Sequence, residues 1–394
     1  MDWNAFEFSY GHRGMAALSA QLIQIDGYRE AALNLVLPPM WREQLDGLNR
    51  VRAVHGTTAL EGNPLSEEEV SEQIDQLTMQ PDASEMSREQ AQIRNVGLAQ
   101  DWIKERFTPD QRPVTYEDVM RMHALVTQGS DETKNVPGEL RQHSVVVGTE
   151  ALGGVHRGAP ANVLAELMGG FIVFINGRRM AEEHPVVRAL VAHFFLVTLH
   201  PFGDGNGRVS RLLEAAMLYR GGYNVLGFYG LSNYFYRNGD EYKLLLQQSR
   251  RKKPFDLTDF VSFGVRGFAA ELKGINNFIK TKLNRLVYRD TLVRAFNQHV
   301  GPRRRILNQR EYRLLDFLLR ETEPTDPFSD EPSLSIRFDE LLAEPYVESA
   351  YRNVTQRTFR RELVRLHEMG FIKVTRDADE GVRIEVDFGA IGRY

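Results

Sequence analysis

The chain has 394 residues, no cysteine and a formal net charge of −4, from 49 lysine and arginine residues against 53 aspartate and glutamate residues. This length allows about two or three domains, the net charge gives no general attraction for nucleic acid, and the lack of cysteine excludes disulfides and thiolate metal sites. The first residues lack the basic start and apolar core of a secretory signal, and the longest apolar stretch, Val186–Leu199, is too short to span a bilayer. We therefore expect a cytoplasmic protein with no membrane partner.

The N-terminal part is predicted to be helical. An arm, residues 1–40, contains one helix at 14–35, and a second helix begins at Trp41 and stops at Gly62. Glu61 lies in the last turn of this second helix, where a carboxylate faces the negative end of the helix dipole and costs up to about 1 kcal/mol. Either Glu61 is a solvated residue that tolerates this cost, or it has a cationic partner elsewhere in the fold.

Three further helices and a hairpin follow in the sequence. The helices are predicted at 66–79, 87–107 and 115–126, the first of them opened by Ser66 as N-cap and Glu69 in a capping box. Residues 144–148 and 155–158 are strand-like segments on either side of a Gly-Gly turn. They predict a β-hairpin in an otherwise helical region.

The central feature is the sequence H-P-F-G-D-G-N-G-R, residues 200–208, followed by Arg211. Apolar segments at 186–199 and 209–219 flank it, so it is predicted to be a loop between two buried helices. The loop leads into a helix N-terminus, where unpaired backbone N–H groups and the helix dipole favour an anion. In the helix before the loop, His193 is predicted to be a core histidine, and Phe202 is predicted to anchor the loop in the core.

The side chains of this loop suit phosphoryl or nucleotidyl transfer. His200 can accept a proton near neutral pH, and Asp204 is the kind of hard oxygen ligand that Mg²⁺ takes when phosphates complete its shell. Arg208 and Arg211 share one helix face and can bind phosphate oxygens together. A glycine-rich loop with a surface histidine is the simpler interpretation, but here every residue type has a role at a workable spacing.

This stretch resembles the signature of the Fic family, H-P-F-x-(D/E)-G-N-G-R-x-x-R, at every specified position from His200 to Arg211. Fic proteins mostly transfer AMP from ATP to a hydroxyl side chain of a protein. The resemblance implies His200 as the base, Asp204 as the Mg²⁺ ligand, and phosphate binding by Gly205, Asn206, Gly207, Arg208 and Arg211. The related Doc kinases carry a variant of the G-N-G-R portion, so its retention here favours adenylyl transfer over phosphoryl transfer.

Residues 57–62, T-T-A-L-E-G, match the inhibitory motif of the same family, (S/T)-x-x-x-E-(G/N), through Thr57, Glu61 and Gly62. In Fic proteins the glutamate of this motif pairs with the second arginine of the signature, here Arg211. That pairing keeps the γ-phosphate from seating productively. The resemblance thus implies the cationic partner that the position of Glu61 suggests.

The predicted hairpin corresponds to the flap of Fic proteins, whose edge pairs with the backbone around the target hydroxyl by strand addition. The docking residues would be Val155, His156, Arg157 and Gly158. The side chains of His156 and Arg157 either contact the target or a phosphate, or are solvated turn residues. Fic proteins often have several prolines after the flap, whereas this chain has only Pro160.

Residues 231–242 form an aromatic, asparagine-bearing segment of the kind that lies near the adenine ring in Fic proteins. By this resemblance Asn238 would bond the base and Tyr242 would pack on it, although Tyr242 also fits a core position on a helix face. The charge run Arg250-Arg251-Lys252-Lys253 is predicted to be a solvated helix end that complements the dipole. A long helix at 257–285, with further helical sequence to residue 300, closes this region.

The C-terminal segment, residues 301–394, has a different pattern. Helices are predicted at 309–321, 338–342 and 354–369, followed by alternating strands at 371–374 and 382–386. This order resembles a winged helix-turn-helix domain, whose recognition helix would be the third helix. Its DNA contacts would be Gln356, Arg357, Arg360 and Arg361. A protein-docking module is the equal alternative, because the fold does not fix the function and an acidic loop at 323–331 suits DNA poorly.

The sequence therefore predicts a mainly α protein with an all-helical Fic core, a small β-hairpin flap and a C-terminal winged-helix domain. The predicted divisions are an N-terminal arm at 1–40, an inhibitory region at 41–110, a catalytic core at 111–300 and the winged helix at 301–394. The predicted function is a protein adenylyltransferase that uses ATP and Mg²⁺, acts on a Ser, Thr or Tyr hydroxyl and is inhibited by Glu61; a homodimer is one option for its assembly. Two alternatives stay open: a DNA-binding regulator with a Fic sensor core, and a hydrolase that removes AMP from a modified protein.

Overall fold

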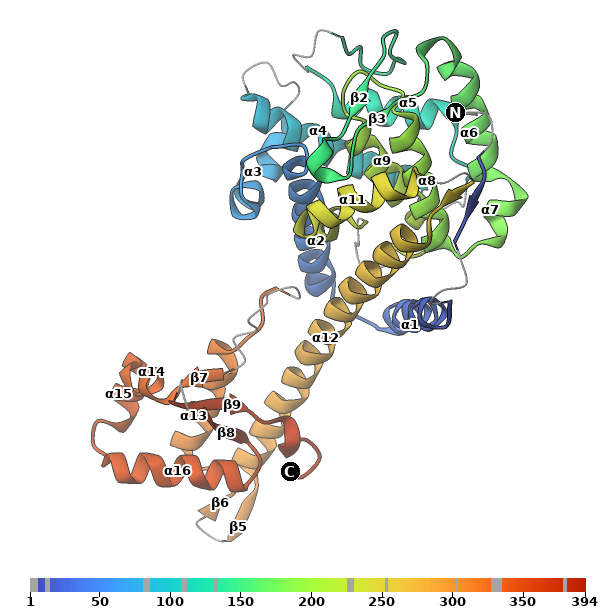
Figure 1. Ribbon diagram of the computed structural model, residues 1–394. Helices are drawn as coiled ribbons and strands as arrows, with labels where there is room; N and C mark the ends of the chain where they lie inside the picture. Colours follow the sequence, from blue (N-terminus) through green and yellow to red (C-terminus); the bar gives the residue numbers. More distant parts are fainter. Residues whose placement is uncertain are drawn as a thin grey trace. The chain divides into compact units, whose positions relative to one another are not determined.

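The computed structural model describes residues 6–10, 15–80, 86–107, 112–129, 134–224, 230–251, 254–301, 304–326, 335–377 and 381–394. The chain divides into two compact units, Met1–Leu272 and Lys273–Tyr394. Figure 1 follows the chain through both units by colour, from blue at the N-terminus to red at the C-terminus. Among the described residues, no helix combines the length and the apolar character that crossing a membrane requires.

The first half of unit 1 is helical, as the sequence predicts. Its helices are α1 (Met15–Asn34), α2 (Pro39–Ala59), α3 (Glu67–Met79), α4 (Arg88–Phe107) and α5 (Tyr116–Val126). The starts of α3 and α5 are fixed by capping boxes, in which Ser66 pairs with Glu69 and Thr115 pairs with Asp118. Pro39 lies in the first turn of α2, where its missing N–H costs no helical hydrogen bond.

The second half of unit 1 holds the central pair of helices. The helices here are α6 (Leu164–Asn176), α7 (Arg178–Glu182), α8 (Pro185–Leu199), α9 (Asn206–Arg220), α10 (Ser232–Arg237) and α11 (Gly239–Ser249), followed by the start of α12 (Thr258–Asn297). Helices α8 and α9 are buried over nearly their whole length and pack against each other. Their connecting loop is therefore held at both ends by the core of the unit.

Two small sheets complete unit 1. Strand β2 (Val146–Val147) pairs antiparallel with β3 (His156–Arg157), which confirms the predicted hairpin. A short 3₁₀ turn, η1 (Glu150–Leu152), lies between these strands, and α11 packs on it. Strand β1 (Phe8–Ser9) pairs in parallel with β4 (Phe255–Asp256). This pairing joins two segments that are far apart in the sequence, and no local sequence pattern predicts it.

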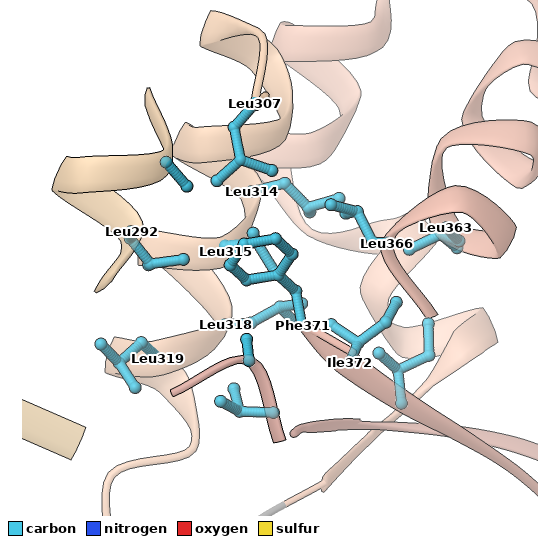
Figure 2. Close-up of a cluster of buried hydrophobic side chains, with 14 of the residues drawn as sticks. Leu292, Leu307, Leu314, Leu315, Leu318, Leu319, Leu363, Leu366, Phe371 and Ile372 are labelled. Atoms are coloured by element: carbon cyan, nitrogen blue, oxygen red, sulfur yellow. The ribbon is translucent and has the colours of Figure 1, made fainter. Parts of the chain in front are cut away.

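Unit 2 contains the rest of α12 and a small α/β arrangement. Its elements are β5 (His299–Gly301), β6 (Arg304–Arg305), α13 (Gln309–Glu321), β7 (Ser335–Arg337), α14 (Phe338–Ala343), α15 (Pro345–Tyr351), α16 (Gln356–Glu368), β8 (Ile372–Asp377) and β9 (Gly381–Val386). Strands β7, β8 and β9 form an antiparallel sheet in the order β7-β9-β8. Figure 2 shows the leucine-rich core between α12, α13, α16 and this sheet, with Leu314, Leu318 and Leu366 at its centre.

Two features of unit 2 differ from the sequence prediction. The division of the chain lies within α12 and not at residue 301, because Tyr288, Leu292 and Ala295 of α12 are fully buried in the core of unit 2. Strand β7 and helix α15 were not predicted, since both are short and lack a clear period. The segment between the predicted strands at 371–374 and 382–386 includes residues 378–380, which lie outside the described part of the chain.

Candidate functional site

The loop between α8 and α9 starts with a residue in an unusual backbone conformation. His200 is the C-cap of α8 and has φ 52° and ψ 58°, the only positive φ outside glycine among the described residues. Its N–H donates to the Leu196 carbonyl oxygen, and its carbonyl oxygen accepts from Nε of Arg141 at 2.7 Å. A left-handed residue persists only where its surroundings fix it, and such residues cluster at functional sites. The Arg141 guanidinium supplies part of that fixation.

The middle of the loop is closed by the side chain of Asn206. Its Oδ1 accepts from the Phe202 N–H, and its Nδ2 donates to the Phe202 carbonyl oxygen, both at 2.9 Å. Phe202 is fully buried and stacks on His123 with 3.9 Å between ring centroids. The prediction that Phe202 anchors the loop is confirmed. The Asn206 amide, however, is engaged in shaping the loop, so only its backbone is left to face a ligand.

Asp204 is oriented by its neighbours and keeps a third of its side-chain surface exposed. Its N–H donates to Oδ1 of Asn135 at 3.0 Å, its Oδ1 accepts from Gly205 N–H at 2.6 Å, and its Oδ2 lies 2.9 Å from Nη2 of Arg208. A single exposed carboxylate fits a Mg²⁺ ion whose other ligands are phosphate oxygens and water. The described residues contain no cluster of three or more histidine, cysteine, aspartate or glutamate side chains that could hold a metal ion.

The N-terminus of α9 is open to an anion, and a carboxylate already lies there. Gly205 is the N-cap with φ 76°, and α9 begins at Asn206. A Cβ placed on Gly207 would lie 2.2 Å from Oε1 of Glu61, so this carboxylate oxygen rests directly against the glycine backbone. Only glycine permits that approach. The position where the helix dipole favours an anion is therefore taken by Glu61.

Glu61 reaches this place from the turn after α2, and Arg211 binds it there. The Oε1 atom of Glu61 accepts from Nη2 of Arg211 at 2.6 Å. The same guanidinium donates from Nε to Oγ1 of Thr57 at 2.6 Å and from Nη2 to the Thr57 carbonyl oxygen at 3.0 Å. Although burial opposes ionisation, the charges of Arg211 and Arg208 hold the pKa of Glu61 below its ordinary value. The pair is thus ionic, and it joins the predicted inhibitory segment to the signature helix.

The turn that carries Glu61 is itself fixed. Gly62 has φ 89°, and the side chain of Asn63 donates to the Glu89 carbonyl oxygen and to Gln92 Oε1. Earlier in α2, a Cβ on Gly56 would lie 2.7 Å from the backbone of Asn233, so α2 and α10 are in close contact there. The carboxylate of Glu61 is therefore presented by a defined turn between packed helices.

The ring of His200 lies beside two cationic groups. Its Nδ1 is 3.3 Å from the Val197 carbonyl oxygen, which leaves Nε2 as the free ring nitrogen. Burial, with the charges of Arg250 and Arg141, lowers the pKa of His200 to about 4. At neutral pH the imidazole is unprotonated, the state that a proton acceptor requires.

A cavity of about 340 Å³ brings these groups together, a size within the range of small-molecule sites. It is lined by Leu60, Glu61, Val147, Gly148, Thr149, Val197, His200, Gly207, Arg211, Tyr242, Lys243, Leu246, Gln247 and Arg250. Tyr242 lies in its wall, where its hydroxyl is 2.9 Å from Nε2 of His193 and its ring stacks on Phe235. Asn238 is not among the lining residues, and its Nδ2 donates to the Tyr234 carbonyl oxygen.

The hairpin residues differ in exposure. Val155 and Arg157 are exposed, whereas His156 is 6% exposed and its Nε2 lies 2.8 Å from the Thr198 carbonyl oxygen. The side chain of His156 is therefore neither a solvated turn residue nor a surface for a target, because it holds the hairpin to the end of α8. Gly158 is buried, and a Cβ on it would lie 3.1 Å from Cβ of His200.

Three site residues were missed by sequence reasoning. Arg141 holds the His200 carbonyl, and Gln247 and Arg250 line the cavity from α11 and its end. The interpretation of Arg250 as solvated is wrong: its guanidinium is partly buried, with Nε 3.1 Å from Oγ1 of Thr198. Its neighbour Arg251 is exposed, and Lys252 and Lys253 lie outside the described residues. No short motif marks these positions, since they reach the site only through tertiary packing.

His193 has the predicted core role. It is fully buried, with Nδ1 2.7 Å from Oε2 of Glu214 and Nε2 bonded to Tyr242. In unit 2, the four residues Gln356, Arg357, Arg360 and Arg361 are all exposed on α16. Arg360 lies over the ring of Phe338 at 5.7 Å, so part of its charge is engaged with an aromatic face.

Comparisons with known proteins find relatives of the segment that contains this loop. Residues 113–218, which include α8, the loop and all but the last two residues of α9, match the family model described as Fic/DOC family. The chain is 34% identical over 170 residues to the protein adenylyltransferase Fic of Drosophila ananassae and 32% identical over 173 residues to that of Aedes aegypti. These matches cover 43% and 44% of the chain, and the chain spans about a third of the length of these relatives.

Solved structures show the same fold. A Fic family protein from Desulfovibrio desulfuricans G20 superposes with a TM-score of 0.56 at 20% identity, covering 96% of this chain and 97% of that one. Fic-1 from C. elegans, in a fragment with an E274G substitution, gives a TM-score of 0.56 at 21% identity over 68% of this chain and 74% of that one. The family match, the relatives and the fold agree: residues 113–218 are similar in sequence to the Fic/DOC family, and the chain has the fold of Fic proteins of known structure.

Proposed function

We propose that the protein transfers AMP from ATP to a hydroxyl side chain of a protein. The observation that carries this proposal is the position of Glu61 Oε1, bound to Arg211 and resting on Gly207 at the N-terminus of α9, within the same cavity as an unprotonated His200. An anion site beside a proton acceptor is the arrangement that nucleotidyl transfer needs. The adenylyltransferase relatives support the same reaction.

In the proposed reaction the phosphates of ATP lie over the backbone of residues 205–207. The target hydroxyl gives its proton to Nε2 of His200, and its oxygen forms a bond to the α-phosphorus. The bond from that phosphorus to the bridging oxygen breaks, and pyrophosphate leaves with its electron pair. Mg²⁺ held by Asp204 would neutralise charge on the phosphates. Arg208 positions Asp204 through their ion pair and Arg211 binds phosphate once Glu61 has left it.

The hairpin would receive the target. Its short strands have an edge to which an extended segment can add by backbone hydrogen bonds. Gly158 supports this assignment, because its missing side chain allows the hairpin to lie against His200. Tyr242, Leu60 and Leu246 give the cavity an apolar wall suited to the adenine ring. Asn238 does not line the cavity, and its Nδ2 is bonded to the Tyr234 carbonyl oxygen, so we assign it no contact with the adenine ring.

Incubation of the wild type and Glu61→Gly with α-labelled ATP and Mg²⁺ tests the proposal. We expect label on the protein or on an added acceptor with the variant, little label with the wild type, and release of pyrophosphate in step with labelling. The exposed third of the Glu61 side chain also suits the orientation of a water molecule, which favours a second reaction, hydrolytic removal of AMP from a modified protein. Free AMP from a modified substrate, lost in Glu61→Gly, would support hydrolysis instead.

We further infer that unit 2 is a winged-helix domain that binds DNA. The element order α13, β7, α14, α15, α16, β8 and β9, with sheet order β7-β9-β8, supports this assignment. The exposed Gln356, Arg357, Arg360 and Arg361 on α16 favour DNA contact. Binding of a mixed-sequence duplex that weakens steeply with salt, and is lost in Arg357→Glu, would support this role. Salt-independent or absent binding would favour protein docking.

A further inference from the structure

A second cavity, of about 430 Å³, lies beside the hairpin and adjoins the 340 Å³ cavity that Glu61, His200 and Arg211 line; we call the latter the nucleotide cavity. It is lined by Gly153, Val155, His156, Arg157, Gly158, Pro160, Gln247, Arg250 and Arg251. Three of these residues are arginines and none of the lining residues is acidic. We call this the arginine cavity and define it by Arg157, Arg250 and Arg251.

The arginine cavity is close to the reacting groups. Gln247 and Arg250 line both cavities and so form the partition between them. Gly158 lines the arginine cavity, and a Cβ on it would lie 3.1 Å from Cβ of His200. A protein segment that presents its hydroxyl to His200 along the hairpin therefore passes the mouth of this cavity within a few residues.

The guanidinium of Arg250 has only neutral partners. Its Nε lies 3.1 Å from Thr198 Oγ1, its Nη1 lies 3.2 Å from Gln247 Oε1, and its Nη2 lies 3.4 Å from the Val197 carbonyl oxygen. Burial lowers the pKa of this group to about 10, so it stays charged at neutral pH. A partly buried cation with neutral, long hydrogen bonds gains more from an anion than a solvated one does.

The other two arginines of the cavity also lack acidic partners within the described part of the chain. Arg251 donates from Nη2 to the Gly153 carbonyl oxygen at 2.7 Å, which fixes its head against the turn of the hairpin. Arg157 is exposed on β3 itself and forms no ion pair with a described residue. The hairpin is thus bordered by positive charge that the fold does not neutralise.

We propose that the arginine cavity binds an acidic side chain of the target protein, located within a few residues of the hydroxyl that accepts AMP. This inference rests on the proposed transfer reaction and adds a sequence preference to it. Guanidinium groups bind carboxylates through paired, directional hydrogen bonds. The nucleotide phosphates have their own site at the start of α9, so the arginine cavity is left for the second substrate.

The test uses the full chain with Glu61→Gly and three synthetic peptides. Each peptide carries the same central Ser-Tyr-Thr acceptor group, flanked by glutamates, by glutamines or by lysines. We expect transfer of labelled AMP to the glutamate peptide to exceed transfer to the glutamine peptide by about tenfold in kcat/KM, the ratio that one charge-assisted hydrogen bond supplies. The preference should shrink as salt is raised.

Charge reversal supplies the decisive comparison. In Arg157→Glu with Arg251→Glu, both exposed positions, the preference should invert toward the lysine peptide, while Arg178→Glu, an exposed arginine on α7, should keep the glutamate preference. The parent protein is the Glu61→Gly chain. Equal rates with the glutamate and glutamine peptides for this parent, or an unchanged peptide preference in the variant with both charges reversed, would overturn the proposal. Inorganic pyrophosphate that abolishes the peptide preference by competition would assign the cavity to the leaving group instead.

The design separates this proposal from the transfer reaction. If no peptide is labelled and the protein does not label itself, the proposed function fails. Fluorescence anisotropy of the same three peptides then still reports on the arginine cavity. Tighter binding of the glutamate peptide to the parent than to the double-reversed variant would sustain the cavity assignment alone, and equal binding would end it.

Discussion

Glu61 and Arg211, 150 residues apart in the sequence, are joined by a 2.6 Å ion pair, and the carboxylate oxygen of that pair rests on the backbone of Gly207. One contact thus occupies both groups to which we assign the nucleotide phosphates, the guanidinium and the helix N-terminus. Arg211 is 3% exposed, so its charge has no solvent to replace Glu61 if the pair opens without a ligand. A nucleotide must supply that replacement.

The first prediction concerns the contact between Glu61 and Arg211, which we expect to inhibit transfer. We expect Glu61→Gly to raise AMP transfer by about tenfold or more, because a charge-assisted hydrogen bond of about 1.5–3 kcal/mol no longer competes with the nucleotide. Glu61→Gln keeps the shape and removes the charge, so its rate should lie between those of the wild type and Glu61→Gly. Rates of label incorporation at an ATP concentration well below saturation check the order, and equal rates for all three proteins there would contradict it.

The second prediction concerns the base. We expect His200→Ala, made in the Glu61→Gly background, to lower AMP transfer by about 10²–10⁴-fold, the usual contribution of general base catalysis. ATP binding, measured by calorimetry, should persist, because the ring contributes to proton removal and the phosphates lie over residues 205–207. A variant that keeps its transfer rate would remove His200 from the proposed role.

The third prediction concerns pH. The unprotonated ring is the active form, so the rate should fall only as pH drops toward the pKa of His200, which is lowered to about 4. Burial is the main cause, and the positive charge of Arg250 adds to it. We therefore expect Arg250→Gln to raise this pKa and move the acid limb of the pH–rate profile to higher pH.

The control for this shift is Arg251→Gln, since Arg251 is the exposed neighbour and is not among the charges that lower the pKa of His200. Titration of the His200 ring by nuclear magnetic resonance gives the pKa directly, without catalysis. An equal pKa in Arg250→Gln and in the wild type would show that burial alone sets it.

The fourth prediction concerns the two hydrogen bonds by which Asn206 closes the loop between α8 and α9. Asn206 is 4% exposed and closes the loop through two hydrogen bonds to the Phe202 backbone. We expect Asn206→Ala to lower the free energy of unfolding by about 1–3 kcal/mol, because it leaves two buried backbone groups without partners. Transfer should fall as well, since the N-terminus of α9 loses its support. Urea denaturation and label incorporation check both parts, and Asn176→Ala on α6 serves as a comparison away from the loop.

Local patterns predicted much of the fold. The capping box of Ser66 and Glu69 predicted the start of α3, and apolar spacing predicted α8, α9 and α16. What escaped prediction depends on pairing at long range. Strand β1 exists only because β4 lies beside it, and the partners are more than two hundred residues apart. Two-residue strands carry no periodic signal that could reveal such a tie.

For the site, the signature gave the order of the chemical groups, and tertiary packing decided their contacts. Asn206 carries an amide that suits a ligand, yet both ends of that amide bond Phe202. His156 follows a turn in the sequence and is nevertheless buried against Thr198. Arg250 belongs to a run of charged residues, and such runs are usually exposed to solvent. Here the end of α11 lies beside α8, so the Arg250 side chain lines the cavity. Those outcomes depend on which surfaces meet, which no single segment encodes.

The Glu61–Arg211 contact lies within one chain and one compact unit, so its occupancy does not depend on how much protein is present. Dilution leaves it intact, and a second molecule is not needed to form it. The tethered carboxylate acts at a high local concentration, which for a short flexible linkage reaches the millimolar range and for a fixed turn exceeds it. A nucleotide that displaces Glu61 from Arg211 must therefore compete against that standing concentration, and a change in the turn at residues 60–62 that moves the carboxylate away would lower it.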